Sequence, residues 1–186
     1  MPPKVKVNKE DIVTVALDVV RREGASALNA RTVAAALGCS TQPVFSNFAT
    51  MEELRFTVAE KATLLYDART AAEVAKATYP PYKASGMAYI RFAKEERELF
   101  KLLFMCDRTG ESIPEEAGSF DRMTALVHGN TGLQEEAATL FHLEMWAYVH
   151  GIATMYATKF LDLDEELVSR MLTDAYQGLR KQYGTE

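Results

Sequence analysis

The sequence has few cysteines, glycines and prolines, and each scarcity excludes a class of protein. Only Cys39 and Cys106 occur among 186 residues, so the chain is not built on disulfides or on a zinc site of cysteine pairs, and Cys106 is expected in the core. Ten glycines and six prolines are too few for a collagen-like or low-complexity chain. No stretch approaches the roughly 18 consecutive apolar residues of a membrane span, and residues 1–10 lack the apolar run of a secretory signal. We therefore expect a cytoplasmic protein without a membrane partner.

Patterns for catalysis and cofactor binding are also missing. The chain has no nucleophile elbow, no P-loop and no dinucleotide-binding glycine pattern. Of the three histidines, His142 and His150 fall on one expected helix about 12 Å apart along its axis, too far to share a metal ion. His128 has no partner at ligand spacing. We expect neither an enzyme nor a metal or other cofactor.

The charge of the chain is unevenly distributed. With 48% apolar and 25% charged residues, the composition is that of a globular protein. Residues 1–50 carry six basic and four acidic side chains, a net charge of +2, whereas the rest carries 15 basic and 22 acidic ones, a net charge of −7. A mildly basic N-terminal part on an acidic remainder suits a protein that presents one end to a polyanion.

A helical period runs through almost every segment, which predicts an all-α fold with three helices in an N-terminal head (residues 1–52) and six in a body (residues 53–186). Asn8 is expected to cap the first helix and Gly24 to end it. Asn29 and Ser40 are expected to cap the second and third helices. The turn between these two spans only residues 38–40, so they should cross steeply as a helix-turn-helix.

The remaining periodic segments define the expected body. A long helix should begin at Met51 and join head to body without a linker, ending before Tyr79-Pro80-Pro81. A helical run, straight or kinked, follows over 83–106. Further helices are expected at 117–127, 133–158 and 164–182, with a turn at residues 128–132.

The segment from Asn8 to Leu54 resembles the DNA-binding head of the tetracycline-repressor (TetR-like) family. The resemblance is carried by Ala16 and Gly24, Arg31-Thr32-Val33-Ala34, Gly38-Cys39-Ser40, Val44-Phe45-Ser46-Asn47-Phe48 and Glu52-Glu53-Leu54. It implies a head that binds operator DNA, a helical body that binds a small-molecule effector, and a homodimer. Where the family usually has a tyrosine and a lysine that contact phosphates, this chain has Phe45 and Met51.

Part of the body resembles one subgroup of that family. Trp146-Ala147-Tyr148-Val149-His150-Gly151 is similar to a Trp…His-Gly signature in the C-terminal domain of the subgroup. Phe92-Ala93 with Glu98-Leu99-Phe100 is similar to its upstream element, although Arg97 stands where a proline is often found.

The third expected helix is the candidate for insertion into the major groove. Gln can bind adenine N6 and N7 together, and Thr can offer a hydroxyl or a methyl group. The alternative is a solvated polar helix start with no DNA contact. The full set of expected DNA-binding residues is Lys4, Lys6, Arg31, Thr32, Ser40, Thr41, Gln42, Pro43, Phe45, Ser46 and Asn47.

Large, soft side chains in the body indicate an adaptable apolar pocket, although any single one fits a core equally well. His150 is either a core hydrogen-bonding group or a polar anchor in the pocket, and Glu144 is a candidate partner for a cationic ligand. The expected pocket residues are Phe100, Phe104, Met123, Met145, Trp146, His150 and Met155.

The helix over 133–158 is apolar on nearly every side, so it needs a cover on two faces. One cover is the body itself, and the other is most simply a second copy of the chain. A strip of small side chains on this helix and an apolar stripe on the last helix define the expected dimer interface: Ala147, Gly151, Thr154, Leu167, Met171, Ala175 and Leu179.

Together these features indicate a ligand-responsive DNA-binding regulator, by resemblance a repressor that an apolar or lipophilic-cationic effector releases from a palindromic operator. The alternative is a helical small-molecule carrier whose head no longer binds DNA, a reading that Phe45 and Met51 favour.

Overall fold

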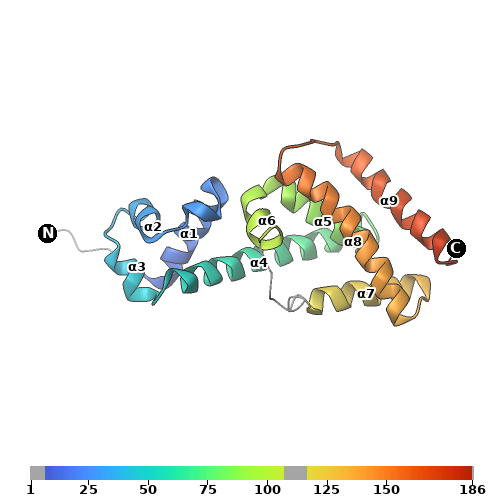
Figure 1. The fold of residues 1–186 in the computed structure, drawn as a ribbon, viewed down its shortest axis with the longest axis horizontal. Coiled ribbons are helices and arrows are strands. Elements are labelled where there is room, and N and C mark those ends of the chain that lie inside the picture. The colour runs from blue at the N-terminus through green and yellow to red at the C-terminus, as the bar shows by residue number, and fades with distance from the viewer. Residues whose placement is uncertain (1–6, 107–116, 186) are drawn as a thin grey trace. The chain divides into compact units, whose positions relative to one another are not determined.

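All regular secondary structure is helical in the computed structural model, which describes residues 7–106 and 117–185. This confirms the expected all-α class. A 3-10 turn, η1 (Ala25–Ala27), follows the first of nine α-helices in the described residues (Figure 1). The helices are α1 (Lys9–Glu23), α2 (Ala30–Ala36), α3 (Gln42–Asn47), α4 (Met51–Ala75), α5 (Pro81–Glu95), α6 (Arg97–Phe104), α7 (Ala117–Thr131), α8 (Glu135–Ala157) and α9 (Glu165–Gln182).

The helices group into two compact units. The N-terminal unit contains α1 to α3, α4 as far as Asp67, and α6, whereas the C-terminal unit contains the end of α4 with α5, α7, α8 and α9. The sequence places the head–body boundary after residue 52, in the first turn of α4, and assigns the residues of α6 to the body. In the structure α6 packs against α1 and η1, so its contacts group it with the N-terminal helices.

The core of the N-terminal unit forms around the apolar stripe of α1. Ile12, Ala16 and Val19 are fully buried there, together with Val33 of α2 and Val44 of α3. The expected cap of α1 is confirmed: Asn8 Oδ1 accepts a hydrogen bond from the Asp11 amide at 2.8 Å, and Asp11 Oδ2 accepts one from the Asn8 amide at 3.1 Å. Gly24 ends α1, also as expected, at a positive φ of 85°.

Helix α6 attaches to the C-terminal end of α1. Leu99, Phe100 and Leu103 are buried. Gly24 lies close to this helix, since a Cβ there would be 2.9 Å from Glu98 Oε2, but it is the positive φ of Gly24 that favours a glycine at this position. The expected run over 83–106 is interrupted at Glu96, whose φ of −120° and ψ of 51° separate α5 from α6. The kinked alternative is therefore the correct one.

The C-terminal unit is organised by α5 and α8, which pack along each other and carry α7 and α9 (Figure 1). Val127, Ala138, Phe141 and Met145 form a buried cluster at the α7–α8 end. The turn expected at 128–132 is wrong for most of its length. Helix α7 continues to Thr131, because the Gly132 amide still donates to the His128 carbonyl at 2.8 Å, and only Gly132 has a positive φ, of 74°.

Arg91 of α5 links three helices of the same unit. It donates to the carboxylate of Glu73 near the end of α4, which is 6% exposed and also accepts a hydrogen bond from Lys76 at 2.9 Å. Arg91 also pairs with Glu165 at the start of α9. The hydrogen bond from Lys76 is the main cause that lowers the pKa of Glu73, so this carboxyl stays ionised as a partner of Arg91.

Candidate functional site

Helix α2 is positioned by the cap that the sequence predicts. Asn29 Oδ1 accepts hydrogen bonds from the amides of Arg31 at 3.0 Å and Thr32 at 3.1 Å. Val33 and Ala34 are buried, which turns the exposed Arg31 away from the core, while Thr32 is half-buried. The first turn of α2 therefore presents one guanidinium group to solvent beside a stabilised helix start.

The turn between α2 and α3 differs from its expected form at one residue. Gly38 has a positive φ of 66°, and the Cys39 amide closes α2 on the Ala34 carbonyl at 3.0 Å. The expectation that Ser40 caps α3 is wrong. The cap position belongs to Thr41, which makes no side-chain capping bond and has helical φ and ψ of −71° and −13°.

Helix α3 is anchored by two side chains and presents the others outward. Val44 and Phe48 are 0% and 1% exposed, whereas Gln42, Phe45 and Ser46 are exposed. Phe45 is 55% exposed. The residues predicted to read DNA thus lie on the outward side of α3, with Thr41, Pro43 and Asn47 half-buried around them.

Hydrogen bonds within α3 divide these polar residues into two groups. Ser46 Oγ donates to the Gln42 carbonyl at 2.9 Å, and Asn47 Nδ2 donates to the Pro43 carbonyl at 2.8 Å. The side chain of Gln42 makes no such bond to another described residue. Gln42 is therefore the polar side chain of α3 that is most available to an external partner.

A carboxylate that the sequence analysis did not single out positions the end of α3. Glu53 at the start of α4 accepts a hydrogen bond from Lys9 of α1 at 2.9 Å and another from the Ala49 amide at 2.8 Å. The bond from Lys9 is the largest of the causes that lower the pKa of Glu53. Lys9 Nζ also lies 4.7 Å from the centroid of the Phe48 ring. Lys9 and Glu53 are 44 residues apart, so no local sequence pattern identifies them as a pair.

The expected basic contribution of Lys4 and Lys6 lies outside the described residues. Among the described basic residues near α3, Lys9 is paired with Glu53, while Arg31 is exposed. The N-terminal unit therefore offers Arg31 as an exposed cation in the first turn of α2.

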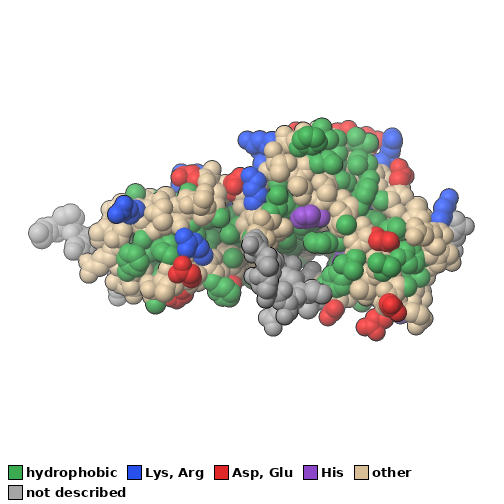
Figure 2. All heavy atoms as spheres, viewed as in Figure 1, with side chains coloured by type: hydrophobic (Ala, Val, Ile, Leu, Met, Phe, Trp, Pro, Cys, Tyr) green, Lys and Arg blue, Asp and Glu red, His purple; other side chains and the backbone are tan. Residues whose placement is uncertain are grey.

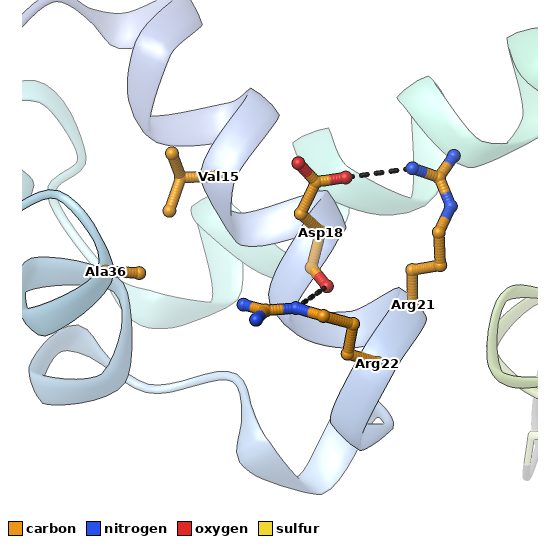
Figure 3. Close-up of a pocket in the computed structure, with 5 residues that line it drawn as sticks. All are labelled: Val15, Asp18, Arg21, Arg22 and Ala36. Carbon is orange, nitrogen blue, oxygen red and sulfur yellow. Dashed lines mark hydrogen bonds and ion pairs between the residues drawn. The ribbon is translucent and has the colours of Figure 1, made fainter.

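Two surface grooves are found in the N-terminal unit, and neither contains a predicted effector residue. The first, about 430 Å³, lies between α1 and α2 and is lined by Val15, Asp18, Arg21, Arg22 and Ala36 (Figure 3). Figure 3 shows Arg21 turned to the Asp18 carboxylate, at 2.8 Å, and Arg22 Nε bonded to the Asp18 carbonyl at 3.3 Å. Arg21 also donates to the buried Glu96 at 2.8 Å, so its charge holds α6 to α1.

The second groove, about 760 Å³, lies between α1 and α4. Its apolar part comes from Val13, Leu17, Leu64 and Leu65, and its rim carries charged side chains of both signs. Leu64 is 69% exposed beside it. No sequence pattern singled out this groove, because its walls come from helices about 50 residues apart.

The seven predicted effector residues are divided between the two units. Phe100 and Phe104 belong to the N-terminal unit, where Phe104 makes an edge contact with Tyr66 at 5.2 Å between centroids. Met123, Met145, Trp146, His150 and Met155 belong to the C-terminal unit. Met145 is part of the buried cluster, whereas Met123 and Met155 are half-buried. A pocket that all seven share stays a prediction.

Trp146 and His150 lie together on α8. The indole is 45% exposed and stacks on the imidazole at 5.3 Å between centroids and 28° between planes. His150 Nδ1 lies 2.8 Å from the Tyr89 hydroxyl of α5, and burial lowers the pKa of His150. The core hydrogen-bonding role expected for His150 thus has a partner, and its role as a pocket anchor stays a prediction.

A second tyrosine–histidine pair joins the same two helices, and the sequence analysis missed it. Tyr82 Oη lies 3.0 Å from His142 Nδ1, and the ring of Phe120 is 4.8 Å from that of His142. Burial lowers the pKa of His142 to about 4, so the imidazole is neutral at pH 7. Tyr82 and Tyr89 are seven residues apart on α5, a spacing that indicates one helix face but does not identify the partners.

Two of the three predicted dimer residues of α8 are exposed. These are Ala147 and Gly151, and a Cβ at Gly151 would meet no atom within 4 Å, whereas Thr154 is half-buried. Leu140 and Leu143, 50% and 41% exposed, extend the same face toward the helix start. Figure 2 shows hydrophobic side chains gathered over α8.

Helix α9 only partly matches its expected dimer stripe. Leu167 and Met171 are half-buried, whereas Ala175 and Leu179 pack against the buried cluster of the same protomer. Glu144, considered as a partner for a cationic ligand, accepts a hydrogen bond from Tyr183 Oη at 3.0 Å. Leu179 and Ala175 therefore contribute to the core of the unit in addition to any outward contact.

Three smaller findings concern the other candidate residues. Cys106 is exposed, so the expectation that it lies in the core is wrong. No group of three His, Cys, Asp or Glu side chains suited to a metal ion occurs in the described part of the chain. None of the described helices is both long enough and apolar enough to cross a membrane.

One comparison with known proteins gives a match. The model of a family described as "Tetracyclin repressor-like, C-terminal domain" matches residues 82–175, which is half of the chain and runs from α5 into α9. No curated protein matches the chain significantly.

Proposed function

Because the chain belongs to the tetracyclin repressor-like family, we propose that it is a homodimeric regulator of transcription that binds palindromic operator DNA and releases it when a small molecule binds. The observation that carries this proposal is the outward side of α3. Three side chains there, Gln42, Phe45 and Ser46, are exposed on a helix held in place by the buried Val44 and Phe48.

The arrangement of α1 to α3 supports insertion of α3 into a major groove. Helices α2 and α3 pack on each other and on α1, joined by a turn of five residues (Figure 1). We propose that this is the helix-turn-helix of the protein and that Thr41, Gln42 and Phe45 approach base edges. Arg31, Thr32 and Lys4 and Lys6 would contact phosphates, which position a protein on DNA without reading its sequence.

The exposed side of α8 supports the homodimer. After Glu144, α8 has no Asp, Glu, Lys or Arg as far as its end at Ala157. The small side chains of Ala147 and Gly151 would let a second helix approach α8 closely. Leu140 and Leu143 would bury apolar surface at the edge of this contact. An isologous contact of α8 and α9 with the same helices of a second copy would place two heads on the two half-sites of a palindrome.

The effector proposal rests on the composition of the body. Aromatic and methionine side chains give adaptable apolar walls, and His150 with Tyr89 supplies a polar group among them. We propose an apolar or lipophilic-cationic effector. A ligand of this kind lowers operator affinity only if it binds the DNA-released state better than the DNA-bound state.

The test of the regulator begins with selection of duplexes from a random-sequence library by the full chain at low salt. The enriched duplex and a shuffled duplex of the same composition are then compared by fluorescence anisotropy. We expect a preference of about a thousandfold for the enriched duplex, the lower end of the usual range for specific over non-specific binding. Equal affinities for the two would contradict the regulator and favour the small-molecule carrier.

The effector is tested on the same complex. Trp146 is the only tryptophan, so its emission reports changes at α8 without a label. Apolar and lipophilic-cationic compounds that change this emission should also raise the dissociation constant for the enriched duplex. Compounds that bind tightly and leave DNA affinity unchanged would contradict the coupling but not the DNA binding.

A further inference from the structure

The outward side of α3 carries no charge, and this limits which bases it can read. Helix α3 contains neither an acidic nor a basic residue. The commonest contact to guanine in the major groove uses the two donors of an Arg, or a Lys, on O6 and N7. That contact is not possible from α3.

The hydrogen bonds within α3 reduce the number of its side chains that are available to DNA. Ser46 donates its hydroxyl hydrogen and Asn47 one of its two amide hydrogens to carbonyls of their own helix, at 2.9 and 2.8 Å, and Asn47 is half-buried. The two exposed side chains that remain are Gln42 and Phe45, three residues apart and therefore neighbours on one side of the helix.

Phe45 differs from the other large apolar side chains of α1, α2 and α3. The described residues of these helices include no other large hydrophobic side chain that is exposed, and Phe48, three residues further on, is only 1% exposed. A single exposed apolar side chain is common on protein surfaces. Here, however, the ring lies three residues from Gln42, whose amide is of the type that can bind adenine, on the outward side of α3.

We infer that α3 reads A·T base pairs, with the Phe45 ring packed against the 5-methyl group of a thymine beside the adenine bound by Gln42. The inference rests on the proposed function. The thymine methyl is the one apolar group that a base exposes in the major groove, so it is the natural partner of an uncharged aromatic ring. Each half-site should therefore contain a thymine whose methyl group is required.

The methyl group can be removed without changing the base pair. In the duplex enriched by the full chain, one thymine position at a time is changed to uracil, at the equivalent positions of both half-sites. The dissociation constant of each duplex is then measured by anisotropy. Burial of one methyl group corresponds to about a fourfold change in affinity. We expect a loss of about four- to sixteenfold at one symmetric pair of thymines, and of less than twofold elsewhere.

Substitutions at α3 then assign the contact. Phe45→Ala should bind the thymine and uracil duplexes equally, and Phe45→Leu, which keeps an apolar side chain, should retain part of the difference. Phe56→Ala is the matched control, because Phe56 of α4 is also an exposed phenylalanine, 67% exposed, but lies outside α3, and this variant should discriminate as the wild type does. Because Phe45 is exposed, both Phe45 variants should fold.

Each other outcome overturns the inference, and all but the last leave the regulator intact. An enriched duplex without sensitivity to any thymine methyl, or with G·C pairs opposite α3, contradicts A·T reading while DNA recognition stands. Discrimination that persists in Phe45→Ala assigns the methyl contact to another residue. Failure to enrich any duplex contradicts the proposed function and this inference with it.

Discussion

Helices α3 and α8 expose side chains in opposite ways. Helix α3 has six residues, one fully buried side chain of its own, and an outward side of Gln42, Phe45 and Ser46. Helix α8 has 23 residues, nine of them buried, and its uncovered side carries Leu140, Leu143, Ala147 and Gly151. Helix α3 offers individual side chains that can contact a partner specifically, whereas α8 offers an apolar strip that another helix can cover.

The difference shows what each surface requires of its partner. The hydrogen-bonding groups on α3 bond to water in the free protein and exchange these bonds for bonds to base edges on DNA. Exposure of this surface in the free protein therefore costs little free energy. Exposed apolar area on α8 is unfavourable in water at about 25 cal/mol per Å², which favours its burial in a second copy. Changes on α3 should therefore affect recognition and leave assembly unchanged, whereas changes on α8 should affect assembly, and operator affinity only through the loss of the second head.

The largest effect is expected on α8. Gly151→Glu would place two carboxylates in an apolar dimer interface, a cost of several kcal/mol, and should convert dimers to monomers in light scattering. Gly129→Glu is the matched control, since Gly129 is also helical, exposed and without neighbours within 4 Å. A dimer that survives Gly151→Glu would place the interface elsewhere.

The two phenylalanines at α3 should separate stability from recognition. Phe48→Ala should lower the free energy of unfolding by about 3–5 kcal/mol, because it leaves a cavity at a side chain that is 1% exposed. Phe45→Ala should change it by less than about 0.5 kcal/mol, as surface substitutions do. Urea denaturation at pH 7.5 measures both, and equal losses would mean that Phe45 is a core residue.

Within the outward side of α3, Gln42 and Ser46 should differ. Gln42→Ala should weaken operator binding by about 1–3 kcal/mol and relax the preference at one base position. Ser46→Ala should have little effect, because the Ser46 hydroxyl is bonded to the Gln42 carbonyl. A loss for Gln42→Ala that is the same on every duplex would reassign Gln42 to a phosphate contact.

The C-terminal unit should lose stability in mild acid. The pKa of His142 is about 4 in the folded protein against 6.5 for the free side chain, so the unfolded chain takes up a proton that the folded chain does not. Stability is therefore lost as pH falls below 6.5, by about 1.3 kcal/mol between pH 7.5 and 5.5 from this residue alone. His142→Phe should flatten the dependence of urea midpoints in this window, and an unchanged slope would assign it to other groups.

The smallest effect is expected from restoring a phosphate contact. Met51→Lys should tighten binding to all duplexes by about 1 kcal/mol or less. The added lysine should also steepen the dependence of log affinity on log salt by about 1. Tightening restricted to one duplex would indicate a base contact by the new lysine instead.

Local rules were sufficient to predict the class of the fold and the two clearest helix starts. The caps at Asn8 and Asn29 follow from side chains that bond amides two or three residues away, so residue type and spacing determine them. The 3.6-residue period likewise determined the all-α class. The same rules misplaced the cap of α3 at Ser40 and the end of α7, because helix ends depend on a few hydrogen bonds of similar energy.

The tertiary structure decided which of these helices meet and which side chains remain available. Arg21 and Glu96, 75 residues apart, bring α6 to α1, and Tyr82 and His142, 60 residues apart, join α5 to α8. No local pattern encodes such pairings, since they form only when packing brings distant helices together. The sequence alone determined that Gln42, Phe45 and Gly151 lie on helices; their exposure follows from how Val44, Phe48 and the α5–α8 core are buried.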